Sequence, residues 1–223
     1  MPVHDWTKVD SSIFHAFHQG WSIEISVRLN RELPKDHYSL ITKNSNIAPL
    51  RRIDDATAYQ NKKNIVVVHR ASDDRIMAII ELISPGNKTT SAGVKRLIEK
   101  VTGLIHEGIH VLLVDVLPGT AHAPESLHES IWHNMQPSSV EQGNDPKKPL
   151  KAVSYECSLA SGCNAYIEDF AIGDAIPTMP LFLLPEHFLN TPLEETYNSA
   201  FAAMPLRWRT VIESDTPPAA SPS

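Results

Sequence analysis

Cysteine is scarce in this chain of 223 residues, which carries only Cys157 and Cys163. Two cysteines cannot build a disulfide framework, and a gap of five residues between them is not the spacing of a zinc site. Glycine, present nine times, is too rare for a collagen-like repeat. We therefore expect a chain that folds around an apolar core in a reducing compartment, the cytoplasm.

Long hydrophobic runs are also missing. The longest runs, residues 77–83, 111–117 and 179–184, are the length of strands and fall short of the roughly 18–20 residues that a membrane helix needs. The opening segment MPVHDW lacks the basic start and apolar stretch of a signal peptide. The sequence therefore predicts a soluble protein with no membrane partner.

Aliphatic residues, by contrast, are plentiful. Hydrophobic residues make up 42% of the sequence, which excludes disorder over the whole chain and is sufficient for a packed core. Thirteen of the 17 prolines lie beyond Leu117, so the character of the chain changes there. We expect one α/β domain over residues 1–215, with a core at 11–117 and a C-terminal extension at 118–213. The Pro-, Ala- and Ser-rich tail at 216–223 is expected to be disordered.

Charge is distributed unevenly along the chain. The net charge is −6, which argues against nucleic acid as a default partner, yet residues 43–100 hold 11 Lys and Arg against 6 Asp and Glu. A basic segment within an acidic chain is typical of a surface that faces phosphate groups. Nucleic acid therefore stays open as a partner, and the sequence does not indicate an oligomeric state.

The core is predicted to run helix, three strands, helix, strand. Apolar residues recur at helical spacing from Ile13 to Leu33 behind a cap at Ser11 or Ser12, and Pro34 ends this helix. The expected elements are a helix at 11–33, strands at 37–42, 65–69 and 76–83, a helix at 91–106 and a strand at 109–116. The middle two strands form a hairpin, and the continuous apolar last strand is expected to be buried and parallel, after a right-handed crossover.

The remaining segments are less regular. Residues 43–63 are predicted to form a long loop with a short strand at 56–59. In the extension we expect a helix at 124–135, strands at 150–156 and 165–172, an extended segment at 177–192, and a final helix at 193–212 interrupted near Pro205.

A carboxylate inside an apolar strand is the main chemical signal. Glu81 lies within the run AIIELI, and burial of a carboxylate is costly without a partner or a metal ion. The turn SPGNK follows, and the next helix carries Lys95, Arg96 and Lys100 near a sheet edge of the kind where ligands bind. A carboxylate that holds Mg²⁺ beside a lysine suits metal-assisted hydrolysis of a phosphodiester. The alternative is a structural ion pair of Glu81 with Lys95 or Arg70.

Residues 77–118 resemble the family known as domain of unknown function 4058. The hallmark of that family is the segment I-E-x-x-S-P-x-N-K, then a helix with a lysine, then a strand with an aspartate. Here these are residues 80–88, Lys100 and Asp115. The likeness extends to the opening segments HDW and FHAFH and to PLFL and LEETY near the end, so it covers most of the chain. The family has no established activity, so this resemblance alone implies none.

A more distant resemblance implies a fold and a chemistry. The segment ELISP followed by Lys95 is similar to Uma-type restriction endonucleases of the PD-(D/E)XK superfamily. Their order of helix, three strands, helix and strand around a mixed central sheet implies a restriction-endonuclease-like α/β core, followed here by a strand and helix extension. Their catalytic lysine lies on the helix after the third strand, which implies Lys95. The resemblance further implies Mg²⁺ at Glu81, with Lys88, Arg96 and Lys100 as contacts to nucleic-acid phosphates.

The first carboxylate departs from the nuclease pattern. Such enzymes have an aspartate, usually in a Pro-Asp step near the second strand, and this sequence contains no Pro-Asp pair. Asp54 and Asp55 are the nearest substitutes, and Asp55 is the better candidate for a catalytic metal ligand beside Glu81. Otherwise both aspartates are solvated loop charges. In that case the protein keeps the fold without catalysis and acts as a binding or assembly module.

Three further residues are candidates for an outer shell around the metal. They are His18 and Glu24 on the first helix and Ser84 in the turn after the third strand. His15 and His18 lie three residues apart and share a helix face. Such histidines also serve in packing, and Glu24 equally fits a solvated position.

Overall fold

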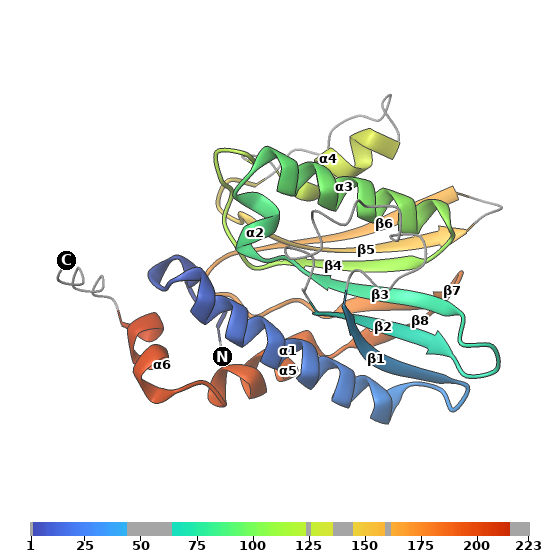
Figure 1. The fold of residues 1–223 in the computed structure, drawn as a ribbon, viewed down its shortest axis with the longest axis horizontal. Helices are drawn as coiled ribbons and strands as arrows, with labels where there is room; N and C mark the ends of the chain where they lie inside the picture. Colours follow the sequence, from blue (N-terminus) through green and yellow to red (C-terminus); the bar gives the residue numbers. More distant parts are fainter. Residues whose placement is uncertain (1, 44–63, 124–125, 136–144, 159–161, 215–223) are drawn as a thin grey trace.

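The computed structural model describes residues 2–43, 64–123, 126–135, 145–158 and 162–214. These residues form a mixed α/β structure with a six-stranded mixed sheet and a separate two-stranded sheet (Figure 1). Asp54, Asp55 and the short strand expected at 56–59 lie outside the described residues, as does the tail from 216.

The first helix, α1 (Ser11–Glu32), confirms the helix expected from the apolar spacing. Its cap is Asp10 rather than Ser11 or Ser12, because the Asp10 carboxylate accepts a hydrogen bond from the Ser12 amide at 2.8 Å. Asp10 therefore caps the helix, in place of the serine that the sequence pattern predicted as the cap.

The core elements follow in the predicted order. They are β1 (His37–Lys43), β2 (Asn64–Arg70), β3 (Ile76–Leu82), α3 (Ser91–His106) and β4 (His110–Asp115). β2 and β3 pair antiparallel as the expected hairpin, and β4 pairs parallel with β3 in the register Glu81 to Leu113. Both predicted pairings are therefore confirmed.

The C-terminal extension adds strands to the same sheet and a hairpin beside it. The extension contains α4 (Leu127–Met135), β5 (Leu150–Ser158), β6 (Gly162–Phe170), β7 (Met179–Leu184), β8 (His187–Thr191), α5 (Leu193–Ala202) and α6 (Leu206–Glu213). β5 and β6 extend the sheet in chain order beyond β4, and β7 and β8 form the two-stranded sheet. The extended segment expected at 177–192 is thus a hairpin, turned at Glu186 with a φ of 64°.

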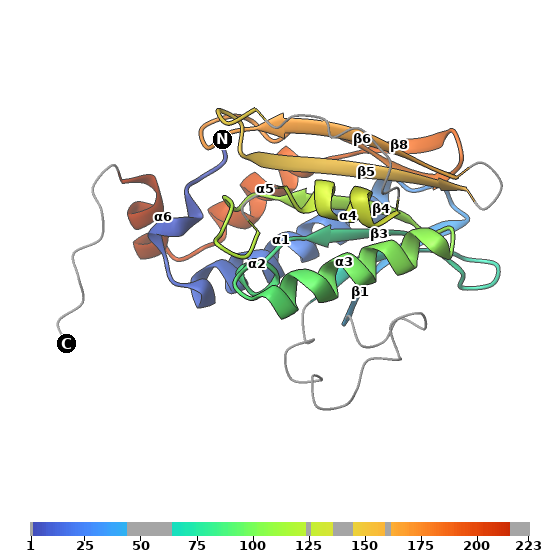
Figure 2. The same ribbon diagram turned by 90° about the horizontal axis from the view of Figure 1, so that it is seen from above.

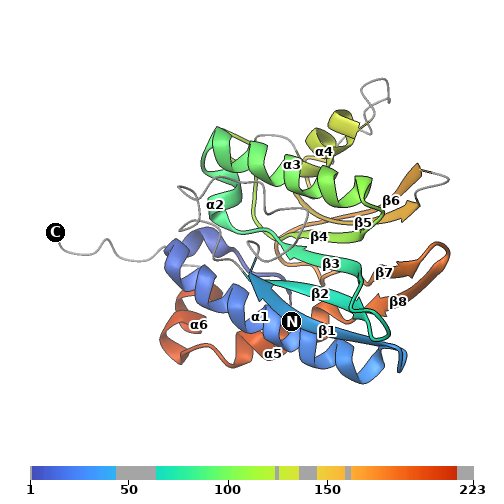
Figure 3. The ribbon, with the colours of Figure 1, turned by 45° about the vertical axis from the view of Figure 1, so that its right-hand side comes forward.

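Two apolar layers lie on opposite faces of the large sheet. Leu112 and Val114 point to the face covered by α1, α5 and β7, whereas Val111 and Leu113 point to the face covered by α3 and α4 (Figures 2 and 3). This alternation follows from the two-residue period of a strand, and it explains why β4 is apolar at every interior position.

The amino-terminal segment packs into the α1 layer and contacts α5 through aromatic side chains. Trp6, in the 3₁₀ helix Trp6–Lys8, donates its indole N–H to the Tyr197 hydroxyl at 3.1 Å, and the His4 amide donates to the same oxygen at 3.1 Å. The opening of the chain is therefore fixed to α5, nearly two hundred residues away. No helix in the described part of the chain is both long enough and apolar enough to cross a membrane.

Candidate functional site

The candidate site lies where the parallel strands β3 and β4 end. Glu81 is the penultimate residue of β3 and Asp115 is the last residue of β4. The short helix α2 (Pro85–Lys88) begins three residues after β3. The sheet therefore brings the I-E-x-x-S-P-x-N-K segment and the β4 aspartate to one edge, where ligands of α/β proteins commonly bind.

The SPGNK turn folds through a reciprocal cap. The Asn87 carboxamide oxygen accepts from the Ser84 hydroxyl at 2.7 Å and from the Ser84 amide at 3.0 Å, while the Ser84 carbonyl accepts from the Asn87 amide at 2.8 Å. Pro85 suits the first helical position because its missing N–H would have no partner there. Ser84, a predicted outer-shell residue, therefore holds the start of α2.

Lys88 forms a buried ion pair with Asp115. Its Nζ lies 2.8 Å from Asp115 Oδ2 and 2.6 Å from the Leu117 carbonyl oxygen, and the side chains are only 3% and 9% exposed. Burial raises the pKa of Asp115, and the Lys88 ammonium and the Leu117 amide oppose that shift. The prediction that Lys88 contacts nucleic-acid phosphate does not fit this burial, because the ammonium is held by protein oxygens.

Lys100, and not Lys95, contacts Glu81. The Lys100 ammonium donates to Glu81 Oε2 in a pair whose side chains are 7% and 3% exposed. Lys95 is 78% exposed and lies 3.8 Å from Glu99, and Arg70 pairs with Asp73. The structure therefore does not bring the expected catalytic Lys95 to Glu81, and Lys100 is buried rather than displayed to phosphate.

The position of Lys100 follows from helical geometry. Leu97, Val101 and Leu104 form the buried face of α3, and Lys100 falls among them at three- and four-residue spacing. Lys95 lies five residues earlier, about 140° around the helix. The apolar spacing of α3 was the signal that could have identified Lys100 as the partner of Glu81. Arg96, the third expected phosphate contact, is partly buried.

The two outer-shell candidates on α1 differ in whether they reach the end of β3. His18 is buried and its Nε2 lies 2.9 Å from the Leu82 carbonyl oxygen, so it does reach the end of β3. Glu24 is partly buried on α1, about a turn and a half further along. His15 is exposed and contacts Gln19 of the same helix.

The carboxylates at this edge do not by themselves fit a magnesium ion. Glu81 and Asp115 each already bind a lysine ammonium. Within the described ranges no three His, Cys, Asp or Glu residues are grouped as metal ligands. Mg²⁺ prefers several unshared oxygens, so binding at Glu81 would require Lys100 to move and a further carboxylate to approach.

A cavity of about 270 Å³ opens beside the Lys88–Asp115 pair. It is lined by the amino-terminal segment, the start of α1, α2 and the chain after β4. Its walls include the rings of Trp6 and Phe14 and the side chains of Ser11, Thr89 and Thr120. Thr120 is fixed there because its hydroxyl donates to the Lys88 carbonyl at 2.6 Å. Ser11 was expected only as a helix cap, and Trp6 and Phe14 belong to the segments HDW and FHAFH that carry the family likeness. No local pattern indicated that they line one cavity, because the lining residues come from segments far apart in the chain.

Comparison of the chain with known protein families, with curated proteins and with solved structures finds no match.

Proposed function

We propose that this chain belongs to the family known as domain of unknown function 4058 and has a PD-(D/E)XK-like core that acts by binding rather than by hydrolysis. The element order α1, β1, β2, β3, α3, β4 and the mixed pairing of these strands support the nuclease-like core. The contacts of Glu81 with Lys100 and of Lys88 with Asp115 also link the residues that carry the family resemblance. Two free thiols suit a cytoplasmic location.

The burial of the Glu81–Lys100 pair carries the proposal. A carboxylate that serves in metal-assisted hydrolysis must hold a metal ion that the substrate can reach, whereas Glu81 is 2% exposed and does not line the cavity at this edge. A buried carboxylate held by an equally buried ammonium is satisfied electrostatically and contributes to the fold. This arrangement favours a module that has kept the nuclease-like fold without its hydrolytic centre.

The adjacent cavity supplies the binding site of the proposed module. Its lining combines Trp6 and Phe14 with Ser11 and Thr89, whose side chains are exposed, which suits a small ligand with an apolar body and a polar edge. Ser11 stands exposed at the start of α1, on the rim of this cavity. A bulky side chain at residue 11 is therefore expected to block the cavity without entering the core.

Calorimetry tests the absence of a metal centre. Titration of Mg²⁺ and Mn²⁺ into the wild type and into Glu81→Gln at low salt should show no binding in either protein. Neither protein should cleave single- or double-stranded DNA or RNA. The fluorescent probe 8-anilinonaphthalene-1-sulfonate tests the cavity: it should bind the wild type and Ser12→Trp, and bind Ser11→Trp at least tenfold more weakly. Equal binding by both tryptophan variants would remove the cavity from the proposal.

One observation favours the second candidate, Mg²⁺-dependent phosphodiester hydrolysis of nucleic acid. A lysine from the helix after β3 does contact Glu81, as the resemblance to Uma-type endonucleases implies, with Lys100 in place of Lys95. This candidate also needs Asp55 as a second metal ligand. Metal binding and cleavage that both disappear in Glu81→Gln would establish hydrolysis and overturn the binding-only proposal.

A further inference from the structure

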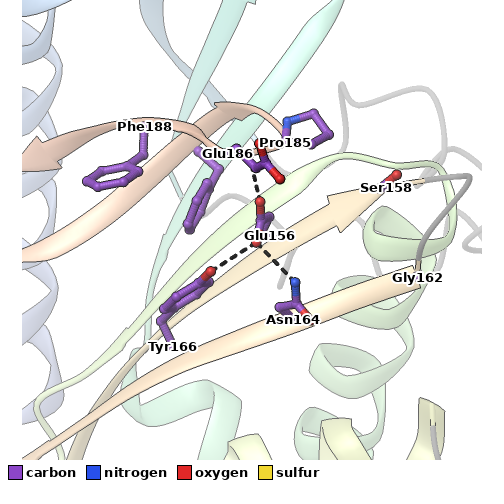
Figure 4. Close-up of a pocket in the computed structure, with 9 residues that line it drawn as sticks. Glu156, Ser158, Gly162, Asn164, Tyr166, Pro185, Glu186 and Phe188 are labelled. Carbon is purple, nitrogen blue, oxygen red and sulfur yellow. Dashed lines mark hydrogen bonds between the residues drawn. The ribbon is translucent and has the colours of Figure 1, made fainter.

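A second cavity, of about 350 Å³, lies between the β5–β6 strands and the β7–β8 hairpin (Figure 4). This cavity lies at the end of the sheet where β4 begins. Glu156, which lines the cavity, follows Tyr155 of β5, and Tyr155 pairs with Val111 near the start of β4. The candidate site described above lies at the other end of β4. The two cavities are therefore separate, and the inference drawn here does not depend on the proposed function.

A fixed carboxylate forms one wall of this cavity. Glu156 Oε1 accepts from the Glu186 amide at 2.7 Å, and Oε2 accepts from the Asn164 carboxamide and the Tyr166 hydroxyl, each at 3.1 Å (Figure 4). Burial acts to raise the pKa of Glu156, but these hydrogen bonds outweigh it and hold the pKa below its ordinary value. Glu156 is therefore ionised at neutral pH and held in one orientation.

The negative charge of the cavity has no cationic partner in the described part of the chain. The carboxylates of Glu156 and Glu186 both line the cavity. The ion pairs of the described residues include neither of them. The nearby His110 does not supply a charge, because burial lowers its pKa and its Nδ1 accepts from the Cys157 amide at 2.9 Å.

Three aromatic rings stand beside these carboxylates. The ring centroids of Tyr166 and Phe182 are 5.1 Å apart, and those of Phe182 and Phe188 are 5.4 Å apart. Tyr166 and Phe188 are 45% and 56% exposed, so both rings are accessible to a ligand, and Phe182 lies in contact with each of them. Aromatic faces next to carboxylates attract an organic cation, because the negative face of the ring quadrupole and the negative charge of the carboxylate both stabilise a positive charge.

We propose that this cavity binds an alkylammonium group, primary or methylated, between the three aromatic rings and the Glu156 and Glu186 carboxylates. The walls distinguish such a group from other ligands. An anion would meet two carboxylates at close range. A hard metal ion would find both Glu156 oxygens already accepting hydrogen bonds, with aromatic rings that offer it no oxygen ligand. A fully methylated ammonium carries no N–H, so it needs no free hydrogen-bond acceptor in the wall and is stabilised by the ring faces and the negative charge.

Calorimetry with a matched pair of probes tests this inference on the full chain. Choline should bind, and 3,3-dimethyl-1-butanol, which has the same shape without the charge, should bind at least tenfold more weakly. Phe188→Ala should weaken choline binding about fivefold, as expected for loss of one aromatic face. Glu156→Gln should weaken it on the order of tenfold through loss of the fixed charge. Leu40→Ala removes an equally exposed side chain of β1 and should leave binding unchanged.

A peptide bearing trimethyllysine distinguishes the two sources of the cation. Tighter binding of the peptide than of choline would assign the site to a protein side chain, and the reverse would assign it to a free small molecule; both results support the inference. Equal binding of choline and its uncharged isostere would overturn it, as would the absence of binding by choline, tetramethylammonium and the peptide. Circular dichroism of each variant checks that the fold is retained. Phe188 is 56% exposed, so its loss should leave the core intact.

Discussion

Lys88 and Asp115 join a four-residue helix to the end of the central strand β4. Their charged atoms lie 2.8 Å apart, and a second carboxylate oxygen of Asp115 accepts from the Leu117 amide at 3.1 Å. The pair therefore fixes both the SPGNK turn and the chain that leaves β4. Because both groups are buried, loss of one partner costs more than the pair itself contributes.

Substitution of Lys88 by methionine should destabilise the protein by about 3–5 kcal/mol at pH 7.5, because Asp115 would remain as an uncompensated buried charge. Urea unfolding at constant pH measures the change. The loss should be smaller at pH 4, where the Asp115 carboxyl of the variant takes up a proton. Lys95→Met on the exposed face of α3 should change stability by less than about 0.5 kcal/mol. Similar losses in the two variants would show that the Lys88 pair is not needed for the fold.

Gly93 marks the closest approach of α3 to α2. A Cβ at this residue would lie 2.7 Å from the Gly86 carbonyl oxygen and 3.1 Å from Thr90 Oγ1. Gly93→Ala should therefore cost about 1–3 kcal/mol, because backbone atoms cannot move aside cheaply. Thermal unfolding of the variant gives this value directly.

Gly103 of the same helix provides the matched control. A Cβ there would meet nothing within 4 Å, so Gly103→Ala should stabilise the protein by about 0.5–1 kcal/mol through its effect on helix propensity. A Gly93→Ala protein as stable as Gly103→Ala would contradict the close packing of α2 on α3.

His128 should make stability depend on pH between about 4 and 6.5. Burial lowers its pKa to about 4, and its Nδ1 forms a hydrogen bond with the Tyr155 hydroxyl at 2.8 Å. The unfolded chain, with the ordinary pKa of 6.5, binds the proton more readily in this range. Stability should therefore fall as the pH drops from 6.5 to 4, by about 1.4 kcal/mol per unit from this group and about 3 kcal/mol in total.

His128→Gln tests that assignment, because glutamine can accept from the same hydroxyl but does not titrate. The slope of unfolding free energy against pH should decrease by about 1.4 kcal/mol per unit below pH 6.5. His133→Gln, at an exposed residue of the same helix α4, should leave the slope unchanged. An unchanged slope in His128→Gln would mean that the buried histidine does not govern this dependence.

Cys157 and Cys163 face each other across β5 and β6, with their sulfur atoms 3.5 Å apart. The hydrogen bond between the two thiols lowers the pKa of Cys163 and raises that of Cys157, and Cys163 is the more exposed of the two. We therefore expect Cys163 to be the nucleophile. Oxidised glutathione should react first with Cys163, releasing one glutathione. Attack by Cys157 on that mixed disulfide should then release the second and close the bridge.

Intact-mass measurement follows this reaction through its variants. Cys157→Ser should retain glutathione on Cys163, whereas Cys163→Ser should remain unmodified because Cys157 is buried. The bridge encloses five residues, so the oxidised wild type should gain at most about 2 kcal/mol of stability. Equal modification of both variants would contradict the difference between the two thiols.

Within the described part of residues 11–117, the sequence predicted α1, β1, β2, β3, α3 and β4, whereas the four-residue helix α2 was expected to be a turn. The apolar spacing of α1 and α3 and the continuous apolar run of β4 each indicate one structure only. The β7–β8 hairpin was missed for two reasons. Pro180 and Pro185 are typical of an irregular extended segment, and the turn at Glu186 contains neither the glycine nor the asparagine that usually marks a hairpin turn.

The candidate site was predicted in its position but not in its pairs. Glu81, Lys88 and Lys100 were each selected, but lysine is usually exposed, so both lysines were expected to be surface contacts. The apolar spacing of α3 is a local signal that Lys100 lies on the buried face of that helix. No comparable signal exists for Lys88, whose burial depends on how α2 packs against the end of β4, a tertiary contact with no local signature.

The attachment of the amino-terminal segment to α5 has a consequence for synthesis of the chain. Trp6 and Trp21 reach their hydrogen-bond partners, Tyr197 and Thr196, only after residue 197 has been synthesised. On the ribosome, β1 and β2 can therefore cover their part of the apolar face of α1 early, whereas the part that packs on α5 stays uncovered until α5 has been made. A chain stopped before residue 193 would leave that part of α1 exposed.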